Sequence, residues 1–252
     1  LGGPHADGPS EAGAPGPIET RRTPRRVMVF GHRGASCCAP ENTLPSIARA
    51  FDLGADHVEI DIRLTSDGTA VLMHDDTVDR VTDGTGRSSQ LSWRQLRRLD
   101  AGRWFDDDFS KTRLTLLRDA LKAISGRGGA ILDVKPTLVG EAVARALRES
   151  KTTPQSLWFY VGVSTETAMD LRRWVPGARI LMGGIPPPPW PEAFARLKTQ
   201  GVVGFELEIE TVTKAFVDAA HEHALIVVAY TAVSPEAMIT AAGLGVDGIE
   251  TD

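Results

Sequence analysis

Short apolar runs alternate with longer amphipathic segments from residue 27 onward. Eight apolar runs have the length of buried strands, at 27–30, 57–62, 130–134, 157–161, 179–182, 202–207, 225–230 and 247–249. Seven segments between them have helical periodicity, at 43–53, 116–125, 140–149, 166–174, 191–199, 211–221 and 235–242. Such alternation is typical of parallel strands joined by right-handed crossovers. Eight units over roughly 250 residues predict an α/β fold, the (β/α)8 TIM barrel.

The pattern is interrupted in two places. Residues 64–114 are too long and too apolar for an ordinary connection, and they contain a short apolar run at 69–73 that predicts a β-extension. We therefore predict a small insertion after the second strand, at about residues 75–113, over the barrel mouth. At the other end only three residues follow the last strand, so the final helix of the barrel is absent from the sequence. An open doubly wound sheet is the alternative fold, but no GxGxxG follows the first strand.

Composition narrows the class of protein. The 252 residues are 42% hydrophobic and 24% charged, as in globular domains. No apolar run approaches the ~18–20 residues that span a bilayer, and the net charge of −5 argues against nucleic acid as the main partner. The two cysteines, Cys37 and Cys38, are adjacent, which excludes a disulfide scaffold and favours the cytoplasm. A secreted or periplasmic location stays open, because the chain begins with Leu1 rather than Met.

Residues 1–26 differ in character from the rest. They contain five Gly and five Pro and no aromatic residue, a composition that buries too little surface to fold. We predict a disordered tail with a charge of about +1, which leaves about −6 on residues 27–252.

Polar residues gather where the predicted strands end, and a barrel of this kind carries its chemistry at those ends. Glu59 and Asp61 share one face of the second strand, because residues two apart in a strand point the same way. Asp133 ends the next strand. An inward carboxylate is costly unless a cation pairs with it. Glu59, Asp61 and Asp133 together predict an all-oxygen site for Mg²⁺ or Ca²⁺.

Four further residues suggest acid–base chemistry on an anion. His32 and His74 each follow a predicted strand, and histidine exchanges protons near neutral pH. The forked guanidinium of Arg33 suits a phosphate, and Lys135 adds a positive charge. A lone histidine after a strand is more often structural, but complementary groups from separate strands meet here at one end.

We expect no part in the chemistry for several other polar residues. Glu206 and Glu208 lack complementary groups nearby in the sequence, so we expect them to be structural or at the rim. His57 opens its strand at the end away from the chemistry. His221 and His223 are expected on the outer ring.

A series of short motifs then follows in order along the chain. They are His-Arg-Gly-Ala at 32–35, Ala-Pro-Glu-Asn-Thr-Leu at 39–44, Gly-Ala-Asp-His-Val-Glu-Ile-Asp at 54–61, Thr-Ser-Asp-Gly at 65–68, His-Asp at 74–75 and Thr-Val-Asp-Arg at 77–80. Thr-Asp-Gly-Thr-Gly at 82–86, Leu-Asp-Ala-Gly at 99–102 and Gly-Val-Asp-Gly-Ile at 245–249 come later. This series resembles the glycerophosphodiester phosphodiesterase family over about residues 27–252.

The resemblance implies a TIM barrel that hydrolyses glycerophosphodiesters to glycerol 3-phosphate and an alcohol with one divalent metal ion. It implies that the catalytic histidines are His32 and His74, and that Arg33 and Lys135 contact the phosphate. The implied metal ligands are Glu59, Asp61 and Asp133. Glu41 and Asn42 match a motif that we interpret as holding the active-site loop.

The chain departs from the family pattern at three positions. Asp133 stands where Glu is usual, Tyr230 replaces a tryptophan but keeps an aromatic substrate wall, and Thr115 replaces a proline. None of these removes a catalytic group. Two alternatives remain. Trp93, Trp104 and Phe105 in the insertion would suit a lysophospholipase D-like or sphingomyelinase D-like enzyme, and the change at Asp133 leaves room for an inactive barrel that binds phosphorylated ligands.

Overall fold

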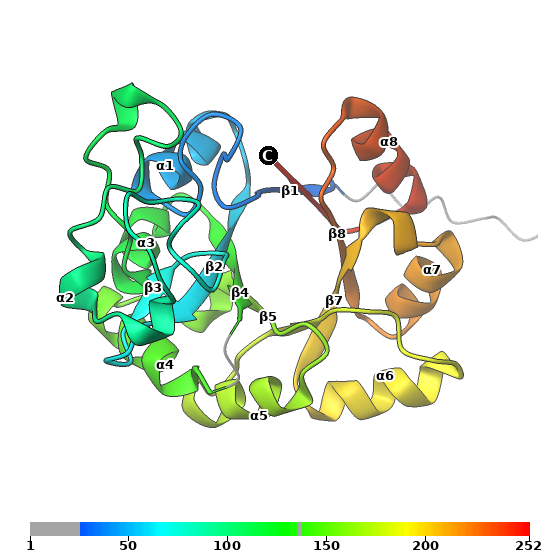
Figure 1. Cartoon of the computed structure of the whole chain (residues 1–252). Coiled ribbons are helices and arrows are strands. Elements are labelled where there is room, and N and C mark those ends of the chain that lie inside the picture. Colours follow the sequence, from blue (N-terminus) through cyan, green and yellow to red (C-terminus); the bar gives the residue numbers. More distant parts are fainter. Residues whose placement is uncertain (1–25, 136–137) are drawn as a thin grey trace, which may run out of the picture.

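The computed structural model describes residues 26–135 and 138–252, and eight parallel strands in them close into a barrel (Figure 1). Around the ring the strands are β1 (Met28–Gly31), β2 (His57–Leu64), β4 (Gly129–Val134), β5 (Leu157–Tyr160), β6 (Ile180–Met182), β7 (Val202–Glu208), β8 (Ile226–Tyr230) and β9 (Gly248–Thr251). β1 pairs with both β2 and β9, which closes the ring. The predicted (β/α)8 barrel is confirmed.

Helices surround the strands on the outside of the ring (Figure 1). They are α1 (Leu44–Asp52), α3 (Leu117–Ile124), α4 (Gly140–Ser150), α5 (Thr165–Trp174), α6 (Trp190–Thr199), α7 (Lys214–Glu222) and α8 (Pro235–Leu244), with short 3₁₀ turns η3 (Pro154–Ser156) and η4 (Ile209–Thr211). α1 and α4 to α8 each come after a barrel strand, and α3 follows the segment inserted after β2. The apolar sides of these helices pack on the ring, as Ile47 of α1 and Phe216 of α7 do. Within the described residues no helix follows β9, as the sequence indicated.

The long segment after β2 forms a separate small unit. It starts with β3 (Ala70–Leu72), which runs antiparallel to β2 and matches the predicted extension. It continues through η1 (Ser88–Gln90), α2 (Trp93–Leu96) and η2 (Asp107–Phe109). Val71, Val78, Val81 and Leu96 are buried together in it, apart from the main core. The insertion therefore has its own hydrophobic centre.

Large apolar side chains fill the inside of the barrel below the carboxyl ends of its strands. Ile131, Trp158 and Val228 form one cluster with Phe30 and Leu181. The first three each precede a polar residue by two positions on the same strand. Because residues two apart share a face, the apolar layer ends where a polar layer begins, at the carboxyl ends of the strands.

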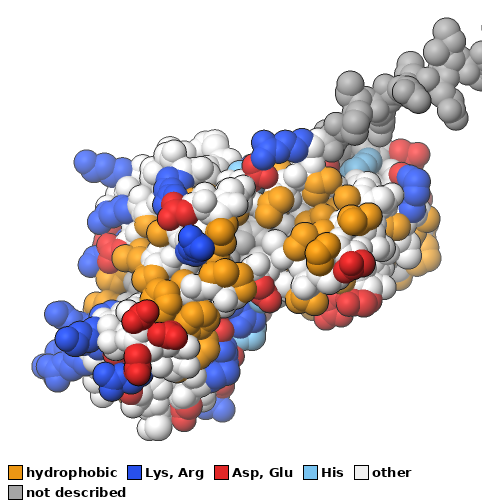
Figure 2. Space-filling model, turned by 90° about the horizontal axis from the view of Figure 1, so that it is seen from above, with side chains coloured by type: hydrophobic (Ala, Val, Ile, Leu, Met, Phe, Trp, Pro, Cys, Tyr) orange, Lys and Arg blue, Asp and Glu red, His pale blue; other side chains and the backbone are white. Residues whose placement is uncertain are grey.

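The outer surface is mixed in character. In Figure 2, charged side chains of both signs cover the lobe at the lower left, and hydrophobic side chains are grouped nearer the middle of that face. Among the described residues no helix is long and apolar enough to cross a membrane. The predicted disordered tail lies outside the described residues, except for Arg26, which pairs with Asp56 at 2.7 Å.

Candidate active site

A cavity of about 270 Å³ opens at the carboxyl ends of the barrel strands. All eight residues that the sequence singled out line it, namely His32, Arg33, Glu59, Asp61, His74, Asp133, Lys135 and Tyr230. Tyr160, Glu206, Thr231 and Glu250 complete the lining. The residues come from strands far apart in the sequence, so it is the closure of the barrel that brings them together.

The three predicted metal ligands lie close enough to share one ion. Glu59, Asp61 and Asp133 each offer a carboxylate oxygen, and these oxygens lie within 4.8 Å of one another. Glu59 and Asp61 are almost fully buried on β2, and Asp133 of β4 pairs directly with Asp61 across the sheet. Lys135 lies 2.9 Å from Asp61 and 2.5 Å from Asp133. The lysine thus holds two of the three carboxylates in place.

Burial and neighbouring charges set the pKa of each of these carboxyl groups. Burial raises the pKa of Glu59 well above its usual value, and the nearby carboxylate of Asp61 adds to the shift. Burial also opposes ionisation of Asp61, but the charge of Lys135 outweighs it and leaves the pKa of Asp61 lowered. Burial likewise raises the pKa of Asp133, against the effect of Lys135. A cation bound between these carboxylates would favour their ionised forms.

The loop between β1 and α1 carries Arg33 into the cavity. Its backbone turns sharply at Gly34, where a Cβ atom would lie 2.4 Å from Oγ of Ser46. Ser46 also completes a capping box with Thr43 at the start of α1. These contacts fix the loop, and the backbone N–H of Arg33 donates to Glu59 at 2.9 Å.

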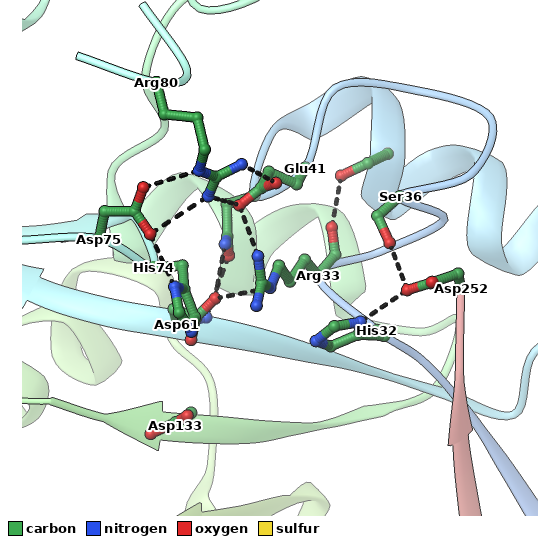
Figure 3. Close-up of polar contacts among 12 residues, drawn as sticks. His32, Arg33, Ser36, Glu41, Asp61, His74, Asp75, Arg80, Asp133 and Asp252 are labelled. Atoms are coloured by element: carbon green, nitrogen blue, oxygen red, sulfur yellow. Dashed lines mark hydrogen bonds and ion pairs between the residues drawn. The ribbon is translucent and has the colours of Figure 1, made fainter. Parts of the chain in front are cut away.

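Glu41 holds two arginines. Its carboxylate accepts from Nη1 of Arg33 at 2.9 Å and from two nitrogens of Arg80 at 2.7 and 2.8 Å. Arg80 belongs to the insertion and also donates to Asp75 at 2.7 Å. Figure 3 shows this chain of contacts running from Asp75 through Arg80 and Glu41 to Arg33. The expected role of Glu41 in holding the loop agrees with these contacts.

Asn42 contacts Asp61, one of the predicted metal ligands, twice. Its side-chain amide donates to Oδ2 of Asp61 at 2.7 Å, and its Oδ1 accepts from the backbone N–H of Asp61 at 3.0 Å. Asn42 has a φ of 58°, a left-handed conformation that asparagine tolerates better than most residues. Its place in the motif is therefore explained by both its backbone and its side chain.

Each histidine is oriented by an aspartate. Nδ1 of His32 lies 2.6 Å from Asp252, which also accepts from Ser36 at 2.8 Å. Nδ1 of His74 lies 2.9 Å from Asp75. In the view of Figure 3 the two imidazoles lie on either side of Arg33. In both rings Nδ1 is engaged, which leaves Nε2 for other partners.

For Glu206 the expected rim position is wrong, and the structural alternative stays a prediction. We placed it at the rim or in a structural role, but it is buried and lines the cavity, whereas Glu208 is exposed. Glu250 of β9 was missed entirely; it is buried, lines the cavity and contacts Glu206. The signal available in the sequence was the position of Glu206 at the end of an apolar strand. Burial raises the pKa of Glu206 to about 8.

The aromatic residues of the insertion lie elsewhere. Trp93 lines a different, mostly apolar hollow beside Leu44 and Leu114, and Trp104 stacks edge-on against Phe105. The aromatic wall of the cavity comes from Tyr230 and Tyr160, whose rings are 6.2 Å apart. Tyr160 thus lies beside Tyr230, for which an aromatic substrate wall is predicted. His57 stacks against Phe30 and Trp158 on the apolar layer, away from the cavity.

The sequence and the structure both resemble known proteins. Residues 32–161 match the model of the glycerophosphoryl diester phosphodiesterase family. Glycerophosphodiester phosphodiesterase 1 of Homo sapiens is 49% identical over 98 residues, which is 38% of this chain and 30% of that protein. Glycerophosphodiester phosphodiesterase of Caldanaerobacter subterraneus is 35% identical over 130 residues, 49% of this chain and 54% of that protein. The match thus spans about a third to a half of these relatives.

Solved structures extend the similarity to nearly the whole barrel. An Oleispira antarctica phosphodiesterase, solved with the product sn-glycerol-3-phosphate, superposes with a TM-score of 0.80 at 27% identity over 89% of this chain and 92% of that one. Glycerophosphodiester phosphodiesterase from Agrobacterium tumefaciens gives a TM-score of 0.76 at 26% identity, over 90% of this chain and 96% of that one.

Proposed function

This chain belongs to the glycerophosphoryl diester phosphodiesterase family, and we propose that it hydrolyses glycerophosphodiesters to glycerol 3-phosphate and an alcohol, assisted by one divalent metal ion, Mg²⁺ or Ca²⁺. One observation supports this most directly. Two histidines, two cationic side chains and the three carboxylates predicted as metal ligands, contributed by separate strands and loops, line a single cavity. The product-bound relative, solved with sn-glycerol-3-phosphate, agrees with the proposed substrate class.

The residues fit a divalent ion. Glu59, Asp61 and Asp133 supply oxygen ligands, the kind that Mg²⁺ and Ca²⁺ prefer. Oε1 of Glu59 is buried and has no hydrogen-bond partner among the described residues, which is an expensive arrangement unless a cation compensates it. Such an ion, when bound, polarises a phosphoryl oxygen as a Lewis acid.

The protein's own side chains bind and orient the phosphate. Arg33 projects from a loop whose position is fixed by Glu41 and by the cap of α1, so its fork is preorganised. Lys135 supplies a second positive charge from the end of β4. Fixed cations of this kind stabilise the negative charge that develops on the phosphoryl oxygens in the transition state.

The two histidines move protons. One removes a proton from the nucleophile as the new P–O bond forms, and the other donates a proton to the alkoxide oxygen as the old P–O bond breaks. The nucleophile is either water or the neighbouring glycerol hydroxyl, which would give a cyclic phosphate first. Asp252 and Asp75 orient His32 and His74 through Nδ1, so Nε2 is the nitrogen that exchanges the proton.

The cavity favours a small, polar substrate. Its lining is polar or charged apart from the rings of Tyr160 and Tyr230. The tryptophans that would suit a lysophospholipid lie outside this lining. We therefore favour a glycerophosphodiester with a short alcohol over the lysophospholipase D-like and sphingomyelinase D-like alternatives.

Turnover of glycerophosphocholine, glycerophosphoethanolamine and a lysophospholipid, measured in parallel, tests the proposal. His32→Ala and His74→Ala should each lose several orders of magnitude in kcat while keeping wild-type circular dichroism. His223→Ala, which removes a histidine outside the cavity lining, serves as the control. Excess EDTA should abolish turnover, and Mg²⁺ or Ca²⁺ should restore it.

Three results would contradict the proposal. Near-normal turnover in either histidine variant would remove that residue from the chemistry. Full activity in EDTA would remove the metal. No turnover of any phosphodiester by the folded, metal-supplied protein would favour the barrel that only binds phosphorylated ligands.

A further inference from the structure

The cavity is lined by more carboxylates than one divalent ion can balance when all of them are ionised. Five carboxylates line it, those of Glu59, Asp61, Asp133, Glu206 and Glu250, against the two permanent cations Arg33 and Lys135. With all five ionised, the excess is three negative charges. One divalent ion leaves one negative charge, in a cavity that has to accept an anionic phosphodiester.

Glu206 and Glu250 account for the surplus. Both are buried, and no Lys or Arg of residues 26–135 or 138–252 forms an ion pair with either. Their side chains contact each other. Two adjacent buried carboxylates repel each other, and burial without a partner is costly. The pair is therefore compensated either by a proton held between the two groups or by a bound cation.

A second set of ligand atoms surrounds Glu250. His32, Glu59 and Glu250 each offer one ligand atom, and these atoms lie within 4.8 Å of one another. Nε2 of His32 is 3.6 Å from Oε1 of Glu250. This is the imidazole nitrogen left over after Nδ1 engages Asp252 at 2.6 Å. An aspartate on the far side of a ligating imidazole is the usual support for a metal-bound histidine.

An independent observation comes from Glu206, which is outside that set of three. Its Oε2 is fully buried and has no hydrogen-bond partner in the described part of the chain. It faces the same cavity from β7, against Glu250. Oε1 of Glu59 and Oε2 of Glu250 are also buried without partners. Glu59, Glu206 and Glu250, which we define as the floor of the cavity, thus each have one buried carboxylate oxygen without a partner in the described part of the chain.

We propose that this floor is a second divalent cation site, formed by His32, Glu59 and Glu250 and completed by Glu206. Glu59 belongs to both ligand sets, so its carboxylate bridges the two ions, as in two-metal hydrolases. The mixed nitrogen and oxygen donors suit Mn²⁺ or Zn²⁺ better than Ca²⁺. With all five carboxylates ionised, two divalent ions turn the cavity's excess to one positive charge.

The proposed function needs only the first ion, so the two claims can fail separately. If His32 binds the second ion when the cavity is fully loaded, its proton-transfer role belongs to the singly loaded enzyme. Excess Mn²⁺ is therefore expected to slow turnover at concentrations above those that saturate the first site.

Binding of Mn²⁺ to the chelator-stripped, full-length protein tests the second site without reference to activity. Free Mn²⁺ is counted from its six-line electron paramagnetic resonance signal during a titration. We expect two bound Mn²⁺ per chain in the wild type, with a spectrum broadened by coupling through Glu59. Glu250→Gln should bind one Mn²⁺ without the coupling. Glu208→Gln, which removes an exposed carboxylate two residues from Glu206, is the matched control and should bind two.

The wild-type stoichiometry is decisive even if a variant fails to fold. One uncoupled Mn²⁺ per wild-type chain would overturn the second site and leave the proposed function intact, provided the protein still turns over glycerophosphocholine. Two Mn²⁺ bound by a folded Glu250→Gln protein would also overturn it. No bound Mn²⁺ at all, together with activity in EDTA, would instead refute the metal requirement in the proposed function.

Discussion

Asn42 gives the sharpest test of how the site is held together. It is buried, and it forms two hydrogen bonds with Asp61, one to the carboxylate at 2.7 Å and one from the backbone N–H at 3.0 Å. Replacing Asn42 by Gly removes both bonds and keeps a residue that tolerates its φ of 58°. The loss in stability therefore reports the side chain rather than the backbone.

The expected magnitude follows from these two bonds. A hydrogen bond to a charged group contributes about 1.5–3 kcal/mol and a neutral one about 1 kcal/mol. The Asp61 groups left behind are buried, so water does not replace the lost partner easily. We expect Asn42→Gly to lower the free energy of unfolding by about 2–4 kcal/mol. Asn42→Ala should be somewhat less stable still, because the left-handed conformation is costly for a residue with a Cβ atom.

Urea unfolding in EDTA measures the effect without a contribution from bound metal. The midpoint should fall for both variants while the slope m stays constant. The Gly variant should also bind Mg²⁺ or Mn²⁺ more weakly, because Asp61 is no longer oriented. A loss below about 0.5 kcal/mol, within the range of ordinary surface changes, would show that Asn42 does not hold Asp61. Equal or greater stability of the Ala variant would refute the backbone argument.

Two further predictions concern charge. Burial raises the pKa of Glu206 to about 8, so in EDTA the folded protein holds a proton that the unfolded chain has lost above about pH 4.3. The free energy of unfolding should therefore fall as pH rises from about 4 to 8. Glu206→Gln should flatten this pH dependence and stabilise the protein at about pH 8. If urea titrations give the same pH dependence for the variant and the wild type, the raised pKa of Glu206 is contradicted. Arg80→Ala should lower kcat/KM about 10–100-fold, because Glu41 then holds Arg33 less precisely, yet cost under about 1 kcal/mol in stability, since Arg80 is partly exposed. Arg80→Lys should recover only part of the rate. A loss of stability above this limit in either variant would indicate that Arg80 has a structural role.

The fold was predictable because its signal is local and repeated. Each strand is a short apolar run and each helix an amphipathic segment, so tertiary context did not have to override the pattern. The differences are at the ends of elements. The strand predicted at 57–62 extends to Leu64, because β3 pairs with its last residues. The helix predicted from residue 211 starts at Lys214, because Thr213 caps it.

The candidate site was predictable where polar residues follow apolar strands. This placed Glu59, Asp61 and Asp133 at one end of the barrel, and the structure brings them together. The same argument applies to Glu206, for which we expected a structural or rim role because complementary groups are lacking nearby in the sequence. A strand end exposes one carboxylate and buries another two residues earlier, a difference that depends on where the strand stops.

Contacts across the seam of the barrel could not be predicted. β1 and β9 are at opposite ends of the sequence, and their pairing sets Phe30 opposite Glu250 and Gly31 opposite Thr251. That register extends β9 two residues beyond the run predicted at 247–249, which turns Glu250 inward. It also brings Asp252 to His32, 220 residues away. The positions of Asp252 and Glu250 beside His32 therefore depend on closure of the barrel. His74 does not depend on it in this way, because its partner Asp75 is the next residue in the chain. A change that loosens the β1–β9 pairing should therefore impair His32 before it affects His74.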